Sequence, residues 1–202
     1  DNPASRMYVR SKDKMCRDLG LHSVKLELPA ETTQAELLAR VEVLNRDPAI
    51  HGILVQSPPP KQIDEAAILR ARDPWKDVDG FHPVNVGKMV AGQKAFLPCT
   101  PNGVVQLLLR SGVKIEGAHV VIVGRSNIVG KPLANMLIQK SPTGNATVTV
   151  CHTRTKNLSS HTLRADIIVA AAGCPKAITA DMVREGAVVI DVGVNRVEDA
   201  TK

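Results

Sequence analysis

Aromatic side chains are scarce in this chain of 202 residues, which holds one Trp, one Tyr and two Phe. Proteins that bind nucleic acid by stacking on bases need more aromatics, and they gather basic residues into clusters. Here the 26 Lys and Arg residues are dispersed, although the formal net charge is +6. The composition therefore argues against a nucleic-acid partner and favours small anionic ligands, such as an acidic substrate and a phosphorylated cofactor.

Long apolar runs and cysteine motifs are also missing. No run approaches the roughly 18 residues of a membrane span and no signal-peptide pattern opens the chain, so we expect no membrane partner. The four cysteines lack Cys-x-x-Cys spacing, which is typical of reduced thiols in the cytoplasm or an organelle matrix. The six histidines show no ligand spacing, so we predict no structural metal.

The most informative segment is a β-branched apolar run, residues 118–123, which stops at Gly124 and is followed by a helical pattern from Gly130. It predicts a buried parallel strand that leads into a helix through a tight turn. The N-terminus of such a helix suits a pyrophosphate. Because Ser126 replaces the second glycine of the usual Gly-x-Gly-x-x-Gly fingerprint, a plain strand–turn–helix connection remains the alternative.

The chain after a second predicted strand, residues 146–150, indicates the cofactor. At this position an acidic residue selects NAD, whereas a basic residue accommodates the 2′-phosphate of NADP. The sequence has Thr153 and Arg154 there and no carboxylate, and Arg125 lies in the glycine turn. Arginines and hydroxyls suit a phosphate better than a ribose diol, so we predict NADP. A solvated surface charge at Arg154 is the alternative.

Further strands are predicted at residues 166–170 and 187–190, with a short helix at 179–186 between them. Each strand runs into small residues, so a ligand could approach the backbone at the carboxyl edge of the sheet. We therefore predict a Rossmann-like lobe with a parallel sheet at residues 100–202.

The first 99 residues carry polar groups at the ends of predicted elements. Tyr8 and Lys12 fall one turn apart on a helix and form a candidate active-site pair, although a lysine extending past packed neighbours is the simpler interpretation. Strands are predicted at residues 24–28 and 52–55, and Gln56 follows the second strand, where a ligand contact would lie.

Capping patterns predict three more helices, whose N-caps are Thr33, Asp64 and Thr100. Residues 76–81 predict a compact turn with two carboxylates, Asp77 and Asp79. Solvated aspartates in an Asx turn are the alternative to ligand binding there. We place the domain boundary after residue 99.

Six motifs occur in the order found in one enzyme family. They are Tyr8-x-x-x-Lys12, Val55-Gln56 before prolines, Lys76-Asp77-Val78-Asp79-Gly80, Pro98-Cys99-Thr100-Pro101, Gly124-Arg125-Ser126-x-x-Val129-Gly130-x-Pro132 and Val192-Gly193-Val194-Asn195. Each motif alone is weak, but six in order are hard to reach by chance. On these motifs the chain resembles the bifunctional methylenetetrahydrofolate dehydrogenase/cyclohydrolase family over nearly its whole length.

The resemblance implies an α/β fold of two lobes with the active site in the cleft between them. Residues 1–99 would form a folate-binding catalytic lobe, and residues 100–202 would form an NADP-binding Rossmann-like lobe. The implied activities are oxidation of 5,10-methylenetetrahydrofolate with NADP and hydrolysis of the methenyl product to 10-formyltetrahydrofolate. Such an enzyme serves one-carbon metabolism and purine biosynthesis, and the resemblance further implies a homodimer.

The resemblance also implies residue roles. Tyr8 is expected to flank the pterin and aminobenzoyl part of the folate, Lys12 to be the key catalytic residue, Gln56 to hold Lys12, and Asp79 to bind the pterin ring. The residues expected to bind the cofactor are Gly124, Arg125, Ser126, Ile128, Thr153, Arg154, Gly173, Cys174 and Val194. Hydride transfer needs chiefly alignment, whereas opening of the methenyl ring needs a group that activates water.

The family normally has a strand and a helix before the point where this chain starts, and further helices after its end. The resemblance therefore implies that the first lobe lacks its first strand and its C-terminal helices, because residues are missing or the protein is shortened. Three alternatives stay open: an NADP-dependent Rossmann oxidoreductase acting on another small acid, a dehydrogenase without the cyclohydrolase step, and a truncated, non-catalytic dinucleotide-binding module.

Overall fold

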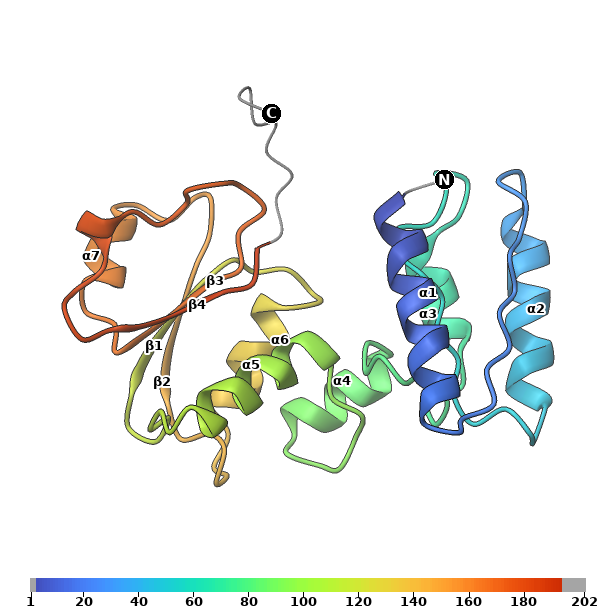
Figure 1. Ribbon diagram of the computed structural model, residues 1–202, viewed down its shortest axis with the longest axis horizontal. Coiled ribbons are helices and arrows are strands. Elements are labelled where there is room, and N and C mark those ends of the chain that lie inside the picture. Colours follow the sequence, from blue (N-terminus) through green and yellow to red (C-terminus); the bar gives the residue numbers. More distant parts are fainter. Residues whose placement is uncertain (1–2, 194–202) are drawn as a thin grey trace. The chain divides into compact units, whose positions relative to one another are not determined.

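The computed structural model describes residues 3–193, with side chains from residue 6 onward. The chain divides into two compact units, unit 1 (Asp1–Val78) and unit 2 (Asp79–Lys202) (Figure 1). No helix among the described residues is long and apolar enough to cross a membrane. The functional boundary after residue 99 stays a prediction.

The described part of unit 1 is built around three helices, and two of them begin at the N-caps that the sequence predicts. The helices are α1 (Pro3–Asp18), α2 (Gln34–Arg46) and α3 (Glu65–Ala71). Thr33 and Glu36 form the predicted capping box of α2, and Asp64 caps α3. Helices α2 and α3 contact one another around a small core of Val41, Ile63 and Ile68.

The two strands predicted in unit 1 are wrong. Residues 24–28 form no strand, and their apolar side chains are exposed. Residues 52–55 contribute only an isolated parallel bridge between Ile53 and Asp77. Alternating or apolar patterns predict extended backbone, but a strand also requires a hydrogen-bonded neighbour, and residues 24–28 have no neighbouring strand within the described part of the chain.

Unit 2 is a parallel α/β sheet, which confirms the predicted fold class. Its strands are β1 (His119–Val123), β2 (Thr147–Cys151), β3 (Ile167–Ala170) and β4 (Val188–Asp191). They lie in the order β2-β1-β3-β4, and all three pairings are parallel. The helices of this unit are α4 (Pro83–Val90), α5 (Cys99–Arg110), α6 (Gly130–Leu137) and α7 (Leu158–Thr162), with a 3₁₀ turn, η1 (Ala180–Met182).

Aliphatic side chains cover both faces of this sheet, so the core forms without aromatics. On one face Val120 of β1 packs with Leu108 of α5 and Leu133 of α6. On the other face Val121 belongs to a cluster against which Leu158 of α7 packs. Helices α5 and α6 and helix α7 accordingly lie on opposite sides of the sheet (Figure 1). Central strands covered on both faces must be apolar on both, which explains the continuous β-branched runs in the sequence.

Two helix boundaries predicted in unit 2 are wrong. Helix α5 has Pro98 as its N-cap and no side-chain cap, so Thr100 lies inside the first turn instead of before it. The helix predicted at residues 179–186 is reduced to η1, because the backbone is extended again at Val183.

Candidate functional site

The four strands of unit 2 end level with one another. Val123 pairs with Cys151 and with Ala170, and Ala170 pairs with Asp191, so these residues form one row across the sheet. The loops that follow therefore leave the sheet at its carboxyl edge, where open parallel sheets bind ligands. The predicted cofactor residues up to position 174 all follow β1, β2 or β3, whereas Val194 lies outside the described residues.

The turn between β1 and α6 depends on two glycines. Gly124 has a φ of +136°, which L side chains rarely adopt, and a Cβ atom there would overlap the carbonyl oxygen of Ala171. A Cβ atom on Gly130 would overlap the carbonyl oxygen of Gly124. Because both positions lack a side chain, α6 begins close beside the end of β1.

Arg125, Ser126 and Ile128 are exposed in this turn. Ser126 Oγ accepts hydrogen bonds from the backbone N–H groups of Val129 (3.1 Å) and Gly130 (3.4 Å). The hydroxyl thus satisfies donors at the start of α6 that a phosphate oxygen would otherwise use. An incoming phosphate must displace the hydroxyl or bind beside it.

Thr153 and Arg154 are exposed in a tight turn that follows β2. The turn is closed by two hydrogen bonds: the N–H of His152 donates to Thr155 Oγ1 (2.9 Å), and the N–H of Thr155 donates to the carbonyl of His152 (2.8 Å). Burial raises the pKa of the Cys151 thiol just before it. Cys151 is therefore protonated at neutral pH and packs as an apolar side chain.

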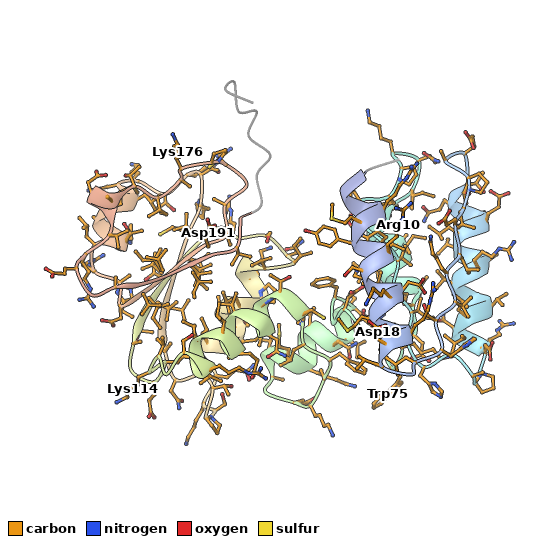
Figure 2. All side chains as sticks on the ribbon, viewed as in Figure 1. Arg10, Asp18, Trp75, Lys114, Lys176 and Asp191 are labelled. Carbon is orange, nitrogen blue, oxygen red and sulfur yellow. The ribbon has the colours of Figure 1, made fainter. Side chains whose placement is uncertain are left out.

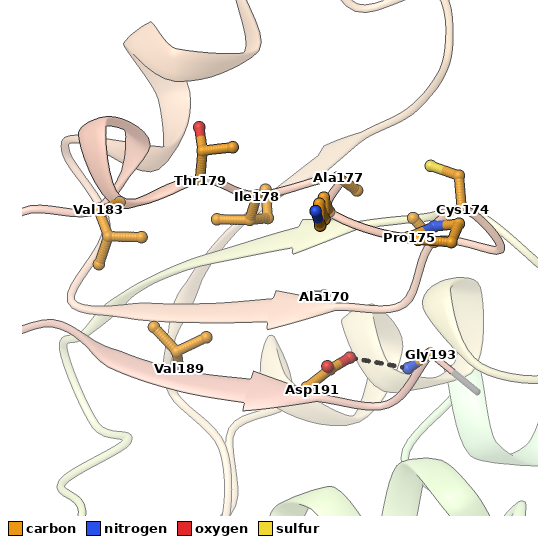
Figure 3. Close-up of a pocket in the computed structure, with 13 residues that line it drawn as sticks. Ala170, Cys174, Pro175, Ala177, Ile178, Thr179, Val183, Val189, Asp191 and Gly193 are labelled. Carbon is orange, nitrogen blue, oxygen red and sulfur yellow. Dashed lines mark hydrogen bonds between the residues drawn. The ribbon is translucent and has the colours of Figure 1, made fainter. Parts of the chain in front are cut away.

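A cavity of about 440 Å³ lies beside the ends of β3 and β4 (Figure 3). Gly173 and Cys174 are exposed in the loop after β3, and Cys174 and Lys176 line the cavity. Asp191 lines it from β4, and its Oδ1 accepts a hydrogen bond from the N–H of Gly193 at 3.1 Å. The cavity adjoins the row of strand ends, so it extends the candidate cofactor site toward β4.

In unit 1 the candidate pair Tyr8 and Lys12 lies on an exposed part of α1, where Tyr8 is 54% exposed. The Lys12 amine donates to Gln56 Oε1 at 3.5 Å. Gln56 Nε2 donates to the carbonyl of Ser57 at 2.9 Å, which orients the amide with its oxygen toward Lys12. Gln56 therefore holds the amine without adding a formal charge.

Helix α1 is tied to the segment after it through Asp13, the residue next to Lys12. Asp13 Oδ1 accepts a hydrogen bond from the Ser23 hydroxyl at 2.8 Å, and Asp13 also pairs with Arg17. The Ser23 hydrogen bond, followed by the contact with Arg17, holds the pKa of the Asp13 carboxyl below its ordinary value. The helix that carries Lys12 is thus anchored by a carboxylate that stays charged.

The two aspartates in the turn after α3 differ in their exposure to solvent. Asp77 is fully buried, and its Oδ1 lies 2.9 Å from Nη2 of Arg72, so the solvated interpretation is wrong for Asp77. Asp79 is half-buried. The Lys76 amine donates to three carbonyl oxygens at the end of α2, those of Leu44, Asn45 and Asp47. The sequence motifs do not predict the contacts of Arg72 and Lys76. The density of opposite charges between residues 70 and 79 is the pattern that could have indicated them.

The structure brings Lys12 to Gln56 within unit 1 and brings the cofactor residues to one sheet edge within unit 2. The cleft expected between the two lobes stays a prediction. Within residues 3–193, no group of three or more His, Cys, Asp and Glu side chains is placed to hold a metal ion. The four cysteines, which all belong to the described residues, form no disulfide.

Two family models match this chain. The model described as tetrahydrofolate dehydrogenase/cyclohydrolase, catalytic domain, matches residues 1–79. The model described as tetrahydrofolate dehydrogenase/cyclohydrolase, NAD(P)-binding domain, matches residues 98–202, which is more than half of the chain.

Relatives of known sequence and structure cover nearly the whole chain. A bifunctional protein FolD from Dehalococcoides mccartyi is 65% identical over 193 residues, and the match spans 96% of this chain but 65% of that relative's length. The bifunctional FolD methylenetetrahydrofolate dehydrogenase/cyclohydrolase from Campylobacter jejuni is 51% identical with a TM-score of 0.93, over 98% of this chain and 69% of that one. The Trypanosoma brucei enzyme, complexed with NADP and an inhibitor, is 40% identical with a TM-score of 0.91, over 100% of this chain and 68% of that one.

Proposed function

Because this chain belongs to the tetrahydrofolate dehydrogenase/cyclohydrolase family, we propose that its protein oxidises 5,10-methylenetetrahydrofolate with NADP and hydrolyses the methenyl product to 10-formyltetrahydrofolate. The observation that carries the proposal is the contact between the Lys12 amine and the Gln56 amide oxygen. Hydride transfer requires alignment more than acid–base help, so an oriented amine is a feature that the hydrolytic step explains.

We assign the folate chemistry to residues 1–99. Tyr8, exposed one turn before Lys12, would flank the pterin and aminobenzoyl rings, and Asp79 would hydrogen-bond the pterin. The Lys12 amine would accept the proton of the water that attacks the methenyl carbon. Gln56 holds that amine through a neutral oxygen, so it adds no charge that would favour the ammonium form.

We assign the cofactor to residues 100–202, where the glycine turn and the closed turn after β2 share one sheet edge. NADP, when bound, would accept the hydride. The backbone around Gly124 would lie against the pyrophosphate, with Arg125, Ser126 and Ile128 beside it. Thr153 and Arg154 would hold the 2′-phosphate, since an arginine and a hydroxyl replace the acidic residue of NAD-selective folds. The residues at the nicotinamide end would be Gly173, Cys174 and Val194.

The proposal includes a homodimer in the cytoplasm. Both statements rest on family resemblance, and the unpaired thiols agree with a reducing compartment.

The test of the hydrolytic role is Lys12→Met in the protein that carries this chain. We expect the rate of ring opening to fall by roughly 100-fold or more, because a general base contributes about 10²–10⁴-fold. The rate is measured as the decrease of methenyltetrahydrofolate absorbance with time. NADP affinity should stay unchanged. Lys14→Met is the matched control, since Lys14 lies two residues further along α1 and pairs with Asp18 at 2.6 Å. Hydrolysis retained in Lys12→Met, or lost equally in Lys14→Met, would refute the role of Lys12.

The test of the cofactor assignment is Arg154→Ala. Loss of a charged hydrogen bond to a phosphate costs about 1.5–3 kcal/mol, so the KM for NADP should rise about 10- to 100-fold while the KM for NAD changes little. Lys156→Ala is the control, because Lys156 is an exposed cation in the same loop. Equal effects on NADP and NAD would contradict a contact between Arg154 and the 2′-phosphate.

A further inference from the structure

We propose that Arg72 is a positioning residue for the folate chemistry. Its guanidinium joins the segment that ends at Gln56 to the turn that leads to Asp79, and it thereby sets where Gln56 stands. The inference rests on the proposed function, because Gln56 matters to catalysis only if Lys12 acts on the folate.

The two segments run side by side and share one isolated parallel bridge. The N–H of Ile53 donates to the carbonyl of Lys76 at 2.7 Å, and Ile53 and Asp77 form a single parallel bridge. The segments approach so closely that a Cβ atom on Gly52 would lie 2.5 Å from a methyl carbon of Val78. A bridge of one residue pair lacks the ladder of hydrogen bonds that specifies register in a full strand pair.

Arg72 contacts both segments. Its Nη1 donates to the carbonyl of Ile53 at 3.2 Å, and its Nη2 lies 2.9 Å from Asp77 Oδ1. The side chains of Arg72 and Asp77 are 3% and 0% exposed, so water does not compete for these contacts. The planar guanidinium presents two nitrogens at a fixed spacing, and each serves one segment.

Hydrogen bonds also hold this turn against the end of α2. Lys76 binds three carbonyl oxygens at the end of α2. Asn45 donates from Nδ2 to the carbonyl of Ala71 at 2.7 Å and accepts at Oδ1 from the N–H of Asp73 at 2.9 Å. Trp75 marks this turn in Figure 2. A change at Arg72 is therefore expected to move the segment that contains Ile53 more than the turn itself.

Displacement of that segment reaches the catalytic pair. Gln56 is three residues beyond Ile53, and its oxygen is 3.5 Å from the Lys12 amine, which is already at the outer limit of a hydrogen bond. A shift of a few tenths of an ångström breaks this contact. The consequence is a lower kcat for ring opening with unchanged NADP affinity, since the cofactor residues belong to unit 2.

The first test is Arg72→Lys, which keeps a cation opposite Asp77 but replaces the two nitrogens by one. We expect the kcat for ring opening to fall about tenfold, with the Kd for NADP unchanged. The paired change Arg72→Met with Asp77→Leu removes both charges of this ion pair and should show the same loss, which separates the effect on position from the cost of one unpaired charge. Thr33→Ala is the control for lower stability, because it removes the capping box of α2 and changes no residue between positions 53 and 78.

The decisive measurement is a double-mutant cycle with Gln56→Ala. If Arg72 acts through Gln56, the loss caused by Arg72→Lys shrinks from about tenfold to less than about twofold once Gln56 is absent. If the losses caused by Arg72→Lys and Gln56→Ala multiply, or if Thr33→Ala lowers kcat as much as Arg72→Lys does, the inference is overturned while the proposed function stays intact. A wild-type protein that lacks both folate activities would overturn the proposed function and this inference with it.

Discussion

Replacing Gly124 with alanine is expected to damage the cofactor turn while sparing unit 1. Gly124 combines a φ of +136° with a site where a Cβ atom would overlap the carbonyl oxygen of Ala171. Ala171 cannot retreat easily, because its N–H donates to the carbonyl of Val123 at 2.9 Å and so continues the pairing of β1 with β3. The added methyl group must therefore push the turn away from the sheet edge.

The magnitude follows from two contributions. A side chain in a glycine-only backbone region costs about 1–3 kcal/mol, and overpacking against a fixed carbonyl costs about another 1–3 kcal/mol. We expect Gly124→Ala to lower the free energy of unfolding by about 2–6 kcal/mol, and the displaced turn to weaken NADP binding at least about tenfold. Denaturant titration would give the first number and calorimetric titration the second. Hydrogen exchange should show faster exchange in β1 and β3 than in the wild type, with α2 unchanged.

Gly112→Ala is the matched control for this experiment. Gly112 also has a positive φ, +71°, but no atom lies within 4 Å of the position that its Cβ would take. Its loss should therefore be backbone strain alone, about 1–2 kcal/mol, with NADP binding unchanged. A Gly124→Ala protein that binds NADP like the wild type, and is no less stable than Gly112→Ala, would refute the reasoning about the crowded turn.

Three further changes test the structure more briefly. Lys76→Met removes three charged hydrogen bonds at the end of α2 and should lower the free energy of unfolding by about 1.5–3 kcal/mol in urea titrations, whereas exposed Lys61→Met should have little effect. Lys176 has a φ of +55°, a backbone conformation that glycine adopts more easily, so Lys176→Gly should raise the free energy of unfolding by about 0.5–1 kcal/mol in thermal unfolding. A lower free energy of unfolding would count against backbone strain at this position. A hydrogen bond of 2.7 Å from the backbone N–H of His119 is the main cause that holds the pKa of the Asp166 carboxyl below its ordinary value. A lowered folded-state pKa stabilises fully above the unfolded pKa, and this contribution is lost as pH falls through the folded pKa. Urea midpoints measured against pH should therefore fall less steeply below about pH 4 in Asp166→Asn than in the wild type, and identical slopes would contradict this origin.

The sheet of unit 2 could be predicted because each strand carries its own signal. Strands β1 and β3 are apolar on both faces, and such runs bounded by glycine or small residues identify buried parallel strands without knowledge of their neighbours. The segments at residues 24–28 and 52–55 show similar local patterns, yet they form no strand pairs. Pairing is a non-local event, and a local pattern does not report whether a partner lies alongside.

In the candidate site, too, the places of motifs could be predicted from the sequence, whereas the contacts of individual side chains could not. The places of the glycine turn after β1 and of Arg154 after β2 could be predicted, because they follow from the order of strands and loops, whereas the role of Arg154 stays a prediction. The hydroxyl of Ser126 at the start of α6 and the guanidinium of Arg72 between two segments could not. Arg72 meets a carbonyl 19 positions earlier in the chain, and composition does not tell which of many acceptors an arginine reaches.

The level ends of the four described strands determine where each connecting loop starts. Each loop departs from a backbone position that the ladder specifies, and the turn at Gly124 also lies close against Ala171, where the loop after β3 begins. The turn from His152 to Thr155 is closed by hydrogen bonds between its own residues. Under the role proposed for Arg154, a loop that carries a carboxylate at this place is expected to shift the coenzyme preference from NADP toward NAD.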